Sequence, residues 1–217
     1  MNRADRAKRG LDLLLGSLLL LLSGPFLAAV ALAIRLDTPG PALFRQDRLG
    51  LGGRIFSIFK FRTMLEGSTH LGTGLETHQG DFRITRVGRI LRHLRIDELP
   101  QLLNVLRGDM SLVGPRPLLP DFLDYYSERD RRRLEAPPGM TGWQQVNGAA
   151  RNTWTERVDL DLWYVDNRSF CLDLWVLLRT VAVVLRADTS YAADGSQKSG
   201  MPDSYAAAKH CRKDGKP

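Results

Sequence analysis

The chain has 217 residues, and its 31 Lys and Arg outnumber 24 Asp and Glu, which gives a formal charge of +7. This length fits one domain with small additions and excludes two full domains. The positive charge favours anionic partners such as phosphoesters, acidic lipids or nucleic acid. The two cysteines, Cys171 and Cys211, have no CxxC spacing, which argues against a disulfide framework or a zinc centre and suits a reducing, cytosolic setting.

The first element is an uncharged apolar segment over residues 13–34. A helix of this length, at about 1.5 Å per residue, extends roughly 33 Å and is long enough to cross a bilayer core. Ser23, Gly24 and Pro25 in its middle favour a bend, because proline lacks an N–H and a serine hydroxyl can bond a freed carbonyl. Basic residues flank both ends: Arg3, Arg6, Lys8 and Arg9 before it, and Arg35, Arg45 and Arg48 after it.

Because both flanks are basic, the positive-inside rule gives no orientation for a single span. We therefore expect a re-entrant helical hairpin that enters one leaflet and returns to the cytoplasmic side. A proline-kinked spanning helix is the main alternative, and a cleaved signal peptide is disfavoured by the length of the apolar stretch. The expected organisation is a basic arm and membrane helix over 1–36, the main domain over 37–190, and a polar, disordered tail over 191–217.

Short elements with turns between them are expected next. A strand should include Lys60 and Arg62, and their spacing places both side chains on one face. The expected elements are a turn at 37–41, a basic loop or hairpin at 45–54, a half-buried strand at 55–62, a glycine-rich loop at 66–81, and a basic amphipathic stretch at 83–95.

The second half is expected to be mainly helical. Asp97 should cap a short helix over 97–106, with Pro100 in its first turn, where the missing N–H has no cost. Longer helices are expected over 121–135 and 158–186. The fold class is therefore a mostly helical α+β membrane domain, with interfacial amphipathic helices and a small β element. Four aromatic side chains suit either the core or a membrane interface: Trp154, Trp163, Tyr164 and Trp175.

Asp97 and Glu98 are adjacent acids, and capping together with the helix dipole would normally explain such a pair. Here arginines surround the pair in sequence. Cations and a helix N-terminus favour ionised carboxylates and also bind phosphate, so an anionic nucleophile beside a phosphate clamp is a reasonable hypothesis. The surrounding cations are Arg86, Arg89, Arg92 and Arg95 before the pair, and Arg116, set between Pro115 and Pro117, after it.

Four sequence runs carry a resemblance to a known family: FKFRTM at 59–64, DELPQ at 97–101, DMSLVGPRP at 109–117 and PGMTGWQQVNG at 138–148. In this order they resemble the bacterial sugar transferase family of polyprenyl-phosphate phosphoglycosyltransferases, and in particular its small, PglC-like monotopic members. The resemblance covers roughly residues 9–186. One departure is Gly24, which stands before the membrane proline where the family often has serine.

The resemblance implies transfer of a sugar 1-phosphate from a UDP-sugar to polyprenyl (undecaprenyl) phosphate, with release of UMP. It implies that Asp97 is the nucleophile, forming a covalent aspartyl-phosphosugar intermediate, and that Glu98 is a second catalytic acid that binds Mg²⁺. The matched substrate-binding residues are Lys60, Arg62, Arg92 and Arg116 for phosphate, and Asp159, with Asp161 as its alternative, for the nucleotide site.

Such an enzyme would act at the cytoplasmic face of the bacterial inner membrane, in the first membrane step of glycoconjugate or exopolysaccharide biosynthesis. Membrane lipid is then a further partner and nucleic acid is not; the sugar and the oligomeric state stay open. One alternative is direct attack by polyprenyl phosphate in a ternary complex. Another is a non-catalytic basic protein on acidic membrane or nucleic acid, which would not require Asp97 and Glu98 among the arginines.

Overall fold

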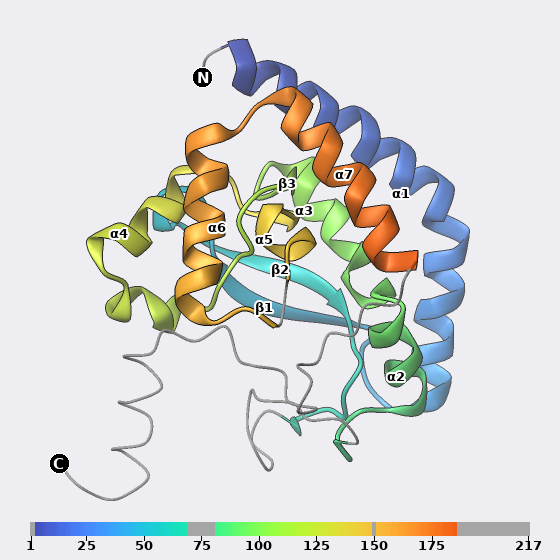
Figure 1. Cartoon of the computed structure of the whole chain (residues 1–217). Coiled ribbons are helices and arrows are strands. Elements are labelled where there is room, and N and C mark those ends of the chain that lie inside the picture. The colour runs from blue at the N-terminus through green and yellow to red at the C-terminus, as the bar shows by residue number, and fades with distance from the viewer. Residues whose placement is uncertain (1–2, 69–80, 149–150, 186–217) are drawn as a thin grey trace, which may run out of the picture.

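A long helix, α1 (Arg3–Asp37), lies along one side of the molecule, and the other elements pack on its inner side (Figure 1). The structure is a computed structural model that describes residues 3–68, 81–148 and 151–185. The tail expected over 191–217 and most of the loop expected over 66–81 lie outside these described residues.

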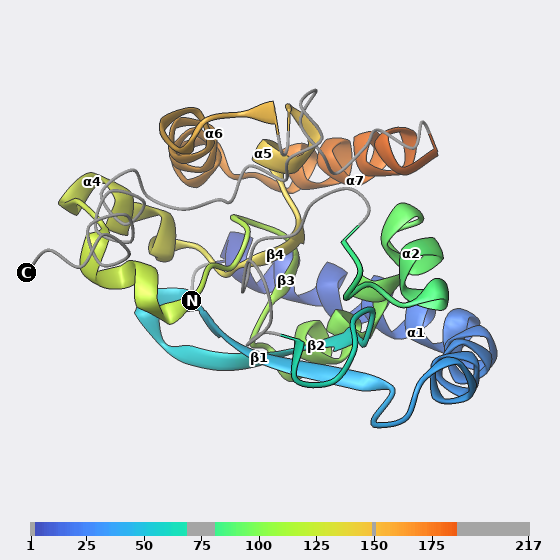
Figure 2. The same ribbon diagram turned by 90° about the horizontal axis from the view of Figure 1, so that it is seen from below.

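Helix α1 is a single helix that changes direction in its middle part (Figures 1 and 2). Pro25 lies in its interior, where the ring removes a backbone hydrogen bond and clashes with the preceding turn. The Ser23 hydroxyl donates to the Leu19 carbonyl at 2.6 Å, so its partner is one turn back on the same helix. The segment expected as a helical hairpin is therefore one bent helix rather than two helices joined by a turn.

Both arms of α1 are fastened to the rest of the protein. In the first arm, Lys8 Nζ donates to the Val113 carbonyl at 2.9 Å, and the buried Asp12 carboxylate accepts the Leu112 N–H at 2.9 Å. The second arm forms a buried apolar cluster that comprises Val30, Ile34, Phe61 and Leu91. The two ends of the helix thus contact one and the same body.

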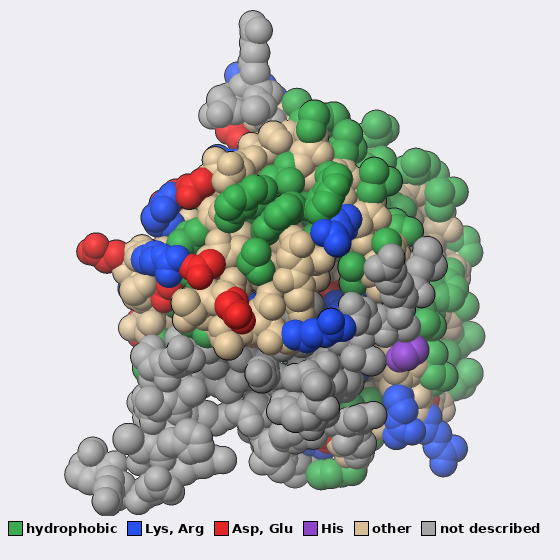
Figure 3. Space-filling view, in the orientation of Figure 1, with side chains coloured by type: hydrophobic (Ala, Val, Ile, Leu, Met, Phe, Trp, Pro, Cys, Tyr) green, Lys and Arg blue, Asp and Glu red, His purple; other side chains and the backbone are tan. Residues whose placement is uncertain are grey.

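Between these anchors, α1 is apolar and exposed. By length and composition it could cross a membrane, yet only 11% of its most apolar window is buried. Leu21, for example, leaves 75% of its surface exposed. Hydrophobic side chains gather along the edge that α1 forms and continue toward α7 (Phe170–Leu185), which lies beside it (Figures 1 and 3). On α7 the exposed large apolar residues are Phe170, Leu174, Trp175, Leu178, Val181 and Val184.

Two small sheets lie inside the bend of α1. Strands β1 (Leu43–Leu49) and β2 (Ile55–Phe61) form an antiparallel hairpin, closed by the 3₁₀ turn η1 (Leu51–Gly53). This confirms the strand expected over 55–62, and the loop or hairpin expected over 45–54 is a hairpin. Strands β3 (Ser111–Val113) and β4 (Gly139–Thr141) pair in parallel.

Helix α2 (Arg86–His93) confirms the basic amphipathic stretch, and Thr85 caps it by accepting the Gly88 N–H at 2.9 Å. The segment around Asp97 differs from the expected helix. A 3₁₀ helix, η3 (Ile96–Gln101), leads into α3 (Leu102–Arg107), and Arg95, not Asp97, stands at the cap with a left-handed φ of 56°. Pro100 explains the tighter winding, because it has no N–H to donate to an α-helical partner.

Two longer helices expected from the sequence are interrupted. The first is divided into η4 (Pro120–Tyr125), α4 (Glu128–Arg131) and η5 (Arg132–Glu135), because Ser127 forms a capping box with Asp130 and starts a new helix. After the short helix α5 (Trp143–Val146), the second is divided into α6 (Trp154–Asn167) and α7. The break between α6 and α7 lies at Ser169, whose hydroxyl accepts the Leu172 N–H at 3.2 Å and so caps the start of α7.

The main core lies where α1, α3, α7 and the two sheets meet, and it resolves the question left by the aromatics. Tyr164 is buried there, and its hydroxyl donates to Asp173 Oδ1 at 2.7 Å. Trp163 and Trp175 are exposed, and the ring of each packs against that of Trp143. The core therefore takes Tyr164, whereas Trp163 and Trp175 belong to the surface.

Candidate active site

Three chain segments meet at the Glu98 carboxylate. Lys60 at the end of β2 places Nζ 2.7 Å from Glu98 Oε1, and Arg116 in the loop after β3 places Nη2 2.8 Å from the same oxygen. Glu98 itself lies in η3, and its side chain is 18% exposed. The fold thus brings together three of the residues that the sequence singled out, although they are far apart along the chain.

Asp97 lies beside this cluster and has a different environment. Within the described part of the chain, its carboxylate accepts no hydrogen bond and forms no ion pair. The pKa of Asp97 is raised to about 6, first by burial and then by the neighbouring charge of Glu98, although Lys60, Arg92 and Arg116 act to lower it. Asp97 is therefore a half-buried carboxylate close to three cations, and neither of its oxygens has a partner among the described residues.

The pKa of Glu98, unlike that of Asp97, is lowered. Burial alone would raise it, but the charges of Arg116 and Lys60 and their hydrogen bonds hold it well below its usual range. Two neighbouring acids whose pKa values are pushed apart are typical of sites in which each acid has its own role. Here Glu98 is ionised and held by two cations, whereas Asp97 has no hydrogen bond from the described residues.

Helix α2 contributes Arg92. Its Nε donates to Thr63 Oγ1 at 2.9 Å, and within the described residues the two terminal nitrogens have no partner. The helix approaches the Thr63 backbone so closely that a Cβ on Gly88 would stand 2.1 Å from the Thr63 carbonyl oxygen. Glycine at position 88 therefore permits the docking that brings Arg92 to the site.

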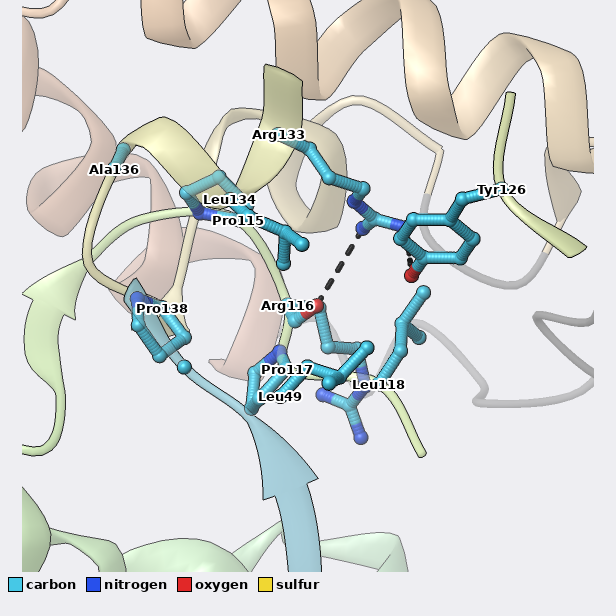
Figure 4. Close-up of a pocket in the computed structure, with 11 residues that line it drawn as sticks. Leu49, Pro115, Arg116, Pro117, Leu118, Tyr126, Arg133, Leu134, Ala136 and Pro138 are labelled. Carbon is cyan, nitrogen blue, oxygen red and sulfur yellow. Dashed lines mark hydrogen bonds between the residues drawn. The ribbon is translucent and has the colours of Figure 1, made fainter. Parts of the chain in front are cut away.

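Arg116 extends away from the small cavity behind its loop. Figure 4 shows this cavity between the proline-rich loop, Tyr126 and Arg133, with the Arg116 guanidinium pointing away from Arg133. The cavity measures about 10 Å³, which is room for one water at most. This cavity is therefore too small for a nucleotide.

Two further cations join the site that the sequence did not single out for substrate binding. Arg48 of β1 is largely enclosed; burial and the nearby Arg116 lower its pKa to about 10, although Glu98 acts to raise it. Burial, Arg116 and Arg133 lower the pKa of Arg157 on α6. Burial is the largest cause of both shifts, and the neighbouring cations add to it, as expected where cations cluster around a site for phosphate groups. Nothing in the local pattern of either segment pointed to the site.

Arg62 does not join the cluster, contrary to the sequence expectation. Its guanidinium donates to the carbonyls of Thr38 at 2.7 Å and Pro39 at 2.5 Å, and so it fastens the connection after α1. The shared face with Lys60 is lost because β2 ends at Phe61, one residue before Arg62. Arg62 is therefore a structural residue of this connection.

Asp159 and Asp161 occupy opposite environments on α6. Asp159 is exposed and forms an ion pair with Arg129 at the surface. Asp161 is 1% exposed and forms a buried ion pair with Arg133, a residue that also reaches the Arg116 carbonyl. Of the two candidates, Asp161 is the one connected to the site.

The donor set fits a divalent cation only in combination with a substrate. Among the described residues, no group of three or more His, Cys, Asp or Glu is arranged to hold a metal ion. Mg²⁺ is commonly held by one or two carboxylates together with phosphate oxygens and waters. Glu98 uses only Oε1 for its ion pairs in the described part of the chain, which leaves Oε2 as a possible ligand.

The fold brings a cluster of cations around two acids, beside a long and exposed apolar helix. The comparison with known families agrees with this description. The chain belongs to the bacterial sugar transferase family, whose model matches residues 3–187.

Curated relatives are similar over most of this chain. It is 47% identical over 178 residues to an uncharacterized sugar transferase, EpsL, of Bacillus subtilis, covering 82% of this chain and 87% of the relative. It is 49% identical over 197 residues to the UDP-glucose:undecaprenyl-phosphate glucose-1-phosphate transferase of Caulobacter vibrioides, covering 86% of this chain and 73% of the relative. The UDP-N-acetylgalactosamine-undecaprenyl-phosphate N-acetylgalactosaminephosphotransferase of Aeromonas hydrophila is 42% identical over 187 residues, covering 82% of this chain and 43% of the relative.

Proposed function

We propose that this protein transfers a sugar 1-phosphate from a UDP-sugar to undecaprenyl phosphate and releases UMP. The observation that carries the proposal is the free Asp97 carboxylate beside the ionised Glu98, within a cluster of cations. Relatives are named for this reaction with UDP-glucose and UDP-N-acetylgalactosamine as donors. The reaction would be a first membrane step of glycoconjugate or exopolysaccharide synthesis.

In the proposed first step, an Asp97 oxygen attacks the β-phosphorus of the UDP-sugar. The bond from this phosphorus to the oxygen that bridges the two phosphates breaks, and UMP leaves with the electron pair. The sugar phosphate is then attached to the Asp97 carboxylate as an acyl phosphate. In the second step, an oxygen of undecaprenyl phosphate attacks the same phosphorus, the bond to Asp97 breaks, and the carboxylate is restored.

The neighbouring residues bind and orient the phosphates. Arg116 and Arg92 have guanidinium nitrogens without protein partners in the described part of the chain, and they suit the non-bridging oxygens of a diphosphate. Lys60 fixes Glu98 and adds positive charge where negative charge develops. Mg²⁺, held by Glu98 and the donor phosphates, would supply neutralisation of the diphosphate charge.

We also propose that α1 enters the membrane and leaves it on the cytoplasmic side. The support is that both arms are bound to one body, the first through Asp12 and the second through Ile34. A spanning helix would separate these two contacts across the bilayer and expose the buried Asp12. The exposed leucines around the bend then lie in the leaflet, with α7 at its surface.

The direct test of the chemistry uses the full-length protein in detergent or nanodiscs with a panel of UDP-sugars. Without acceptor, a two-step enzyme should release one UMP per protein and add a phosphosugar mass to the peptide that contains Asp97. Asp97→Asn should lower turnover by at least about 10⁴-fold, as removal of a covalent nucleophile does. Full turnover by this variant, with deamidation excluded, would contradict the proposal, and UMP release only when acceptor is present would favour the ternary mechanism.

The topology is tested with a single cysteine at position 3 in a variant without Cys171 and Cys211. A membrane-impermeant maleimide should fail to label it in intact cells and should label it after permeabilisation. A cysteine at Asp47, in the hairpin, serves as the matched cytoplasmic control. Labelling of position 3 alone in intact cells would mean that α1 spans the membrane.

A further inference from the structure

The loop that carries Arg116 is held at four consecutive backbone carbonyls. Pro115 and Pro117 restrict the φ angles on either side of Arg116, but prolines alone leave ψ free. Each carbonyl from 115 to 118 accepts a hydrogen bond, and the four donors come from three segments, two of them from β1. The donors are Gly139 N to Pro115 at 2.9 Å, Arg133 Nη2 to Arg116 at 3.4 Å, Arg48 Nη1 to Pro117 at 3.4 Å and Leu49 N to Leu118 at 2.8 Å.

Arg133 makes the contact to the central carbonyl, that of Arg116 itself, and it is enclosed on every side that the structure describes. Its side chain is 4% exposed, and it forms the ion pair with the buried Asp161. Its guanidinium carbon lies 5.4 Å from the ring centroid of Trp154, and Nη1 lies 3.5 Å from the Tyr126 hydroxyl. Figure 4 shows Arg133 between the Tyr126 ring and the Arg116 carbonyl. A cation packed in this way is not available to bind a substrate.

Stability alone is a weak explanation for this ion pair. Removing two charges from water is so unfavourable that an apolar pair of similar volume is often as stable as a buried ion pair, or more stable. The pair joins η5 and α6 and, through Arg133 Nη2, reaches the backbone of the residue whose side chain meets Glu98. The geometry therefore links Asp161, Arg133, the Arg116 carbonyl and the Arg116 guanidinium in one series of contacts.

We propose that Arg133 and Asp161 form a positioning pair that holds the Arg116 backbone, so that the Arg116 guanidinium stays directed at Glu98 and at the donor diphosphate. Neither member of the pair touches the substrate. This inference rests on the proposed function, in which Arg116 binds phosphate. It predicts that the effect of removing the pair depends on the presence of Arg116.

The test is a double-mutant cycle on UMP release by the full-length protein. The variant Arg133→Met/Asp161→Asn removes both charges and leaves no buried lone charge. We expect kcat/KM for the UDP-sugar to fall by about tenfold or more in the presence of Arg116, and by less than about twofold in an Arg116→Ala background. The same factor in both backgrounds would overturn the proposal and assign the pair to structure alone.

A second variant covers the case in which the double substitution does not fold. Arg133→Lys keeps an ion pair with Asp161 but loses the planar group that reaches several acceptors at once. It should show the same dependence on Arg116, with a smaller loss. Equal losses with and without Arg116 in this folded variant would also overturn the proposal.

The matched control is the ion pair between Lys8 and Asp173, which joins α1 to α7 and contacts no residue of the Arg116 loop in the described part of the chain. Lys8→Met/Asp173→Asn should change kcat/KM by the same factor with and without Arg116. If the wild-type protein releases no UMP from any UDP-sugar, the proposed function fails. The cycle is then measured as UDP affinity by calorimetry, which reports the coupling of Arg133 to Arg116 independently of turnover.

Discussion

Two clusters of charged side chains differ in how many of their charged groups form hydrogen bonds or ion pairs within the protein. Lys8, Asp12 and Asp173 anchor α1, and Lys8 Nζ reaches three acceptors while Asp12 accepts two hydrogen bonds. Around Glu98, by contrast, Asp97 has no hydrogen bond from the described residues. Both clusters therefore contain buried charge. The candidate active site differs because one of its carboxylates, that of Asp97, has no hydrogen bond from the described residues.

The largest loss of stability is expected from a substitution in the cluster of Lys8, Asp12 and Asp173. Lys8→Met removes the cation and leaves Asp173, which is 3% exposed, without its ion pair. Loss of one partner from a buried pair lowers the unfolding free energy by about 3–5 kcal/mol. Chemical unfolding of the detergent-solubilised protein measures this effect. A loss under about 1 kcal/mol would show that the anchor is no more than a surface ion pair.

At Asp97, by contrast, we expect that removing the charge raises the unfolding free energy. The folded pKa of Asp97 is about 6, against 3.8 for the ordinary side chain, so the folded state holds a proton more strongly than the unfolded state. The unfolding free energy therefore falls as pH rises from about 3.8 to 6, and it stays low above that range. In metal-free buffer near pH 7, Asp97→Asn should raise the unfolding free energy by up to about 3 kcal/mol, at 1.36 kcal/mol per pKa unit.

This gain should shrink as the pH is lowered and vanish below about pH 4, where the wild-type carboxyl group is protonated in both states. Thermal unfolding of the wild type and the variant across this pH range provides the measurement. Asp159→Asn, the same substitution at an exposed position, is measured in parallel as the control. A destabilised Asp97→Asn variant at neutral pH would contradict this prediction and would mean that the folded protein stabilises the Asp97 carboxylate.

The smallest of the expected effects is at Arg116. Arg116→Lys keeps the charge beside Glu98 but loses the planar pair of donors, so kcat/KM should fall by about tenfold, or 1.4 kcal/mol. Arg129→Lys, on the surface pair with Asp159, is the matched control and should leave the kinetics unchanged. Wild-type kinetics for Arg116→Lys would assign the residue to structure alone.

Local chemistry explains what could be predicted. The bend in α1 follows from a proline in a helix, the strand over 55–62 from alternation, and α2 from its amphipathic period. The grouping of Lys60, Glu98 and Arg116 was expected from the resemblance to the family. The position of Asp97 was wrong in detail, because the winding around Pro100 and the left-handed Arg95 shift the start of the helix.

Sequence by itself determined that an apolar, proline-bent helix precedes a basic domain with an acidic pair, because these features depend on residues that are neighbours in the chain. Only the tertiary structure decided which charges act together. Asp159 and Asp161 lie two positions apart on α6 and therefore face different sides, so burial selects Asp161 for Arg133. Arg48 and Arg133 reach the Arg116 loop from β1 and η5, and Arg62 turns away from it. Such contacts join segments distant in sequence, and their energies depend on packing that no local pattern contains.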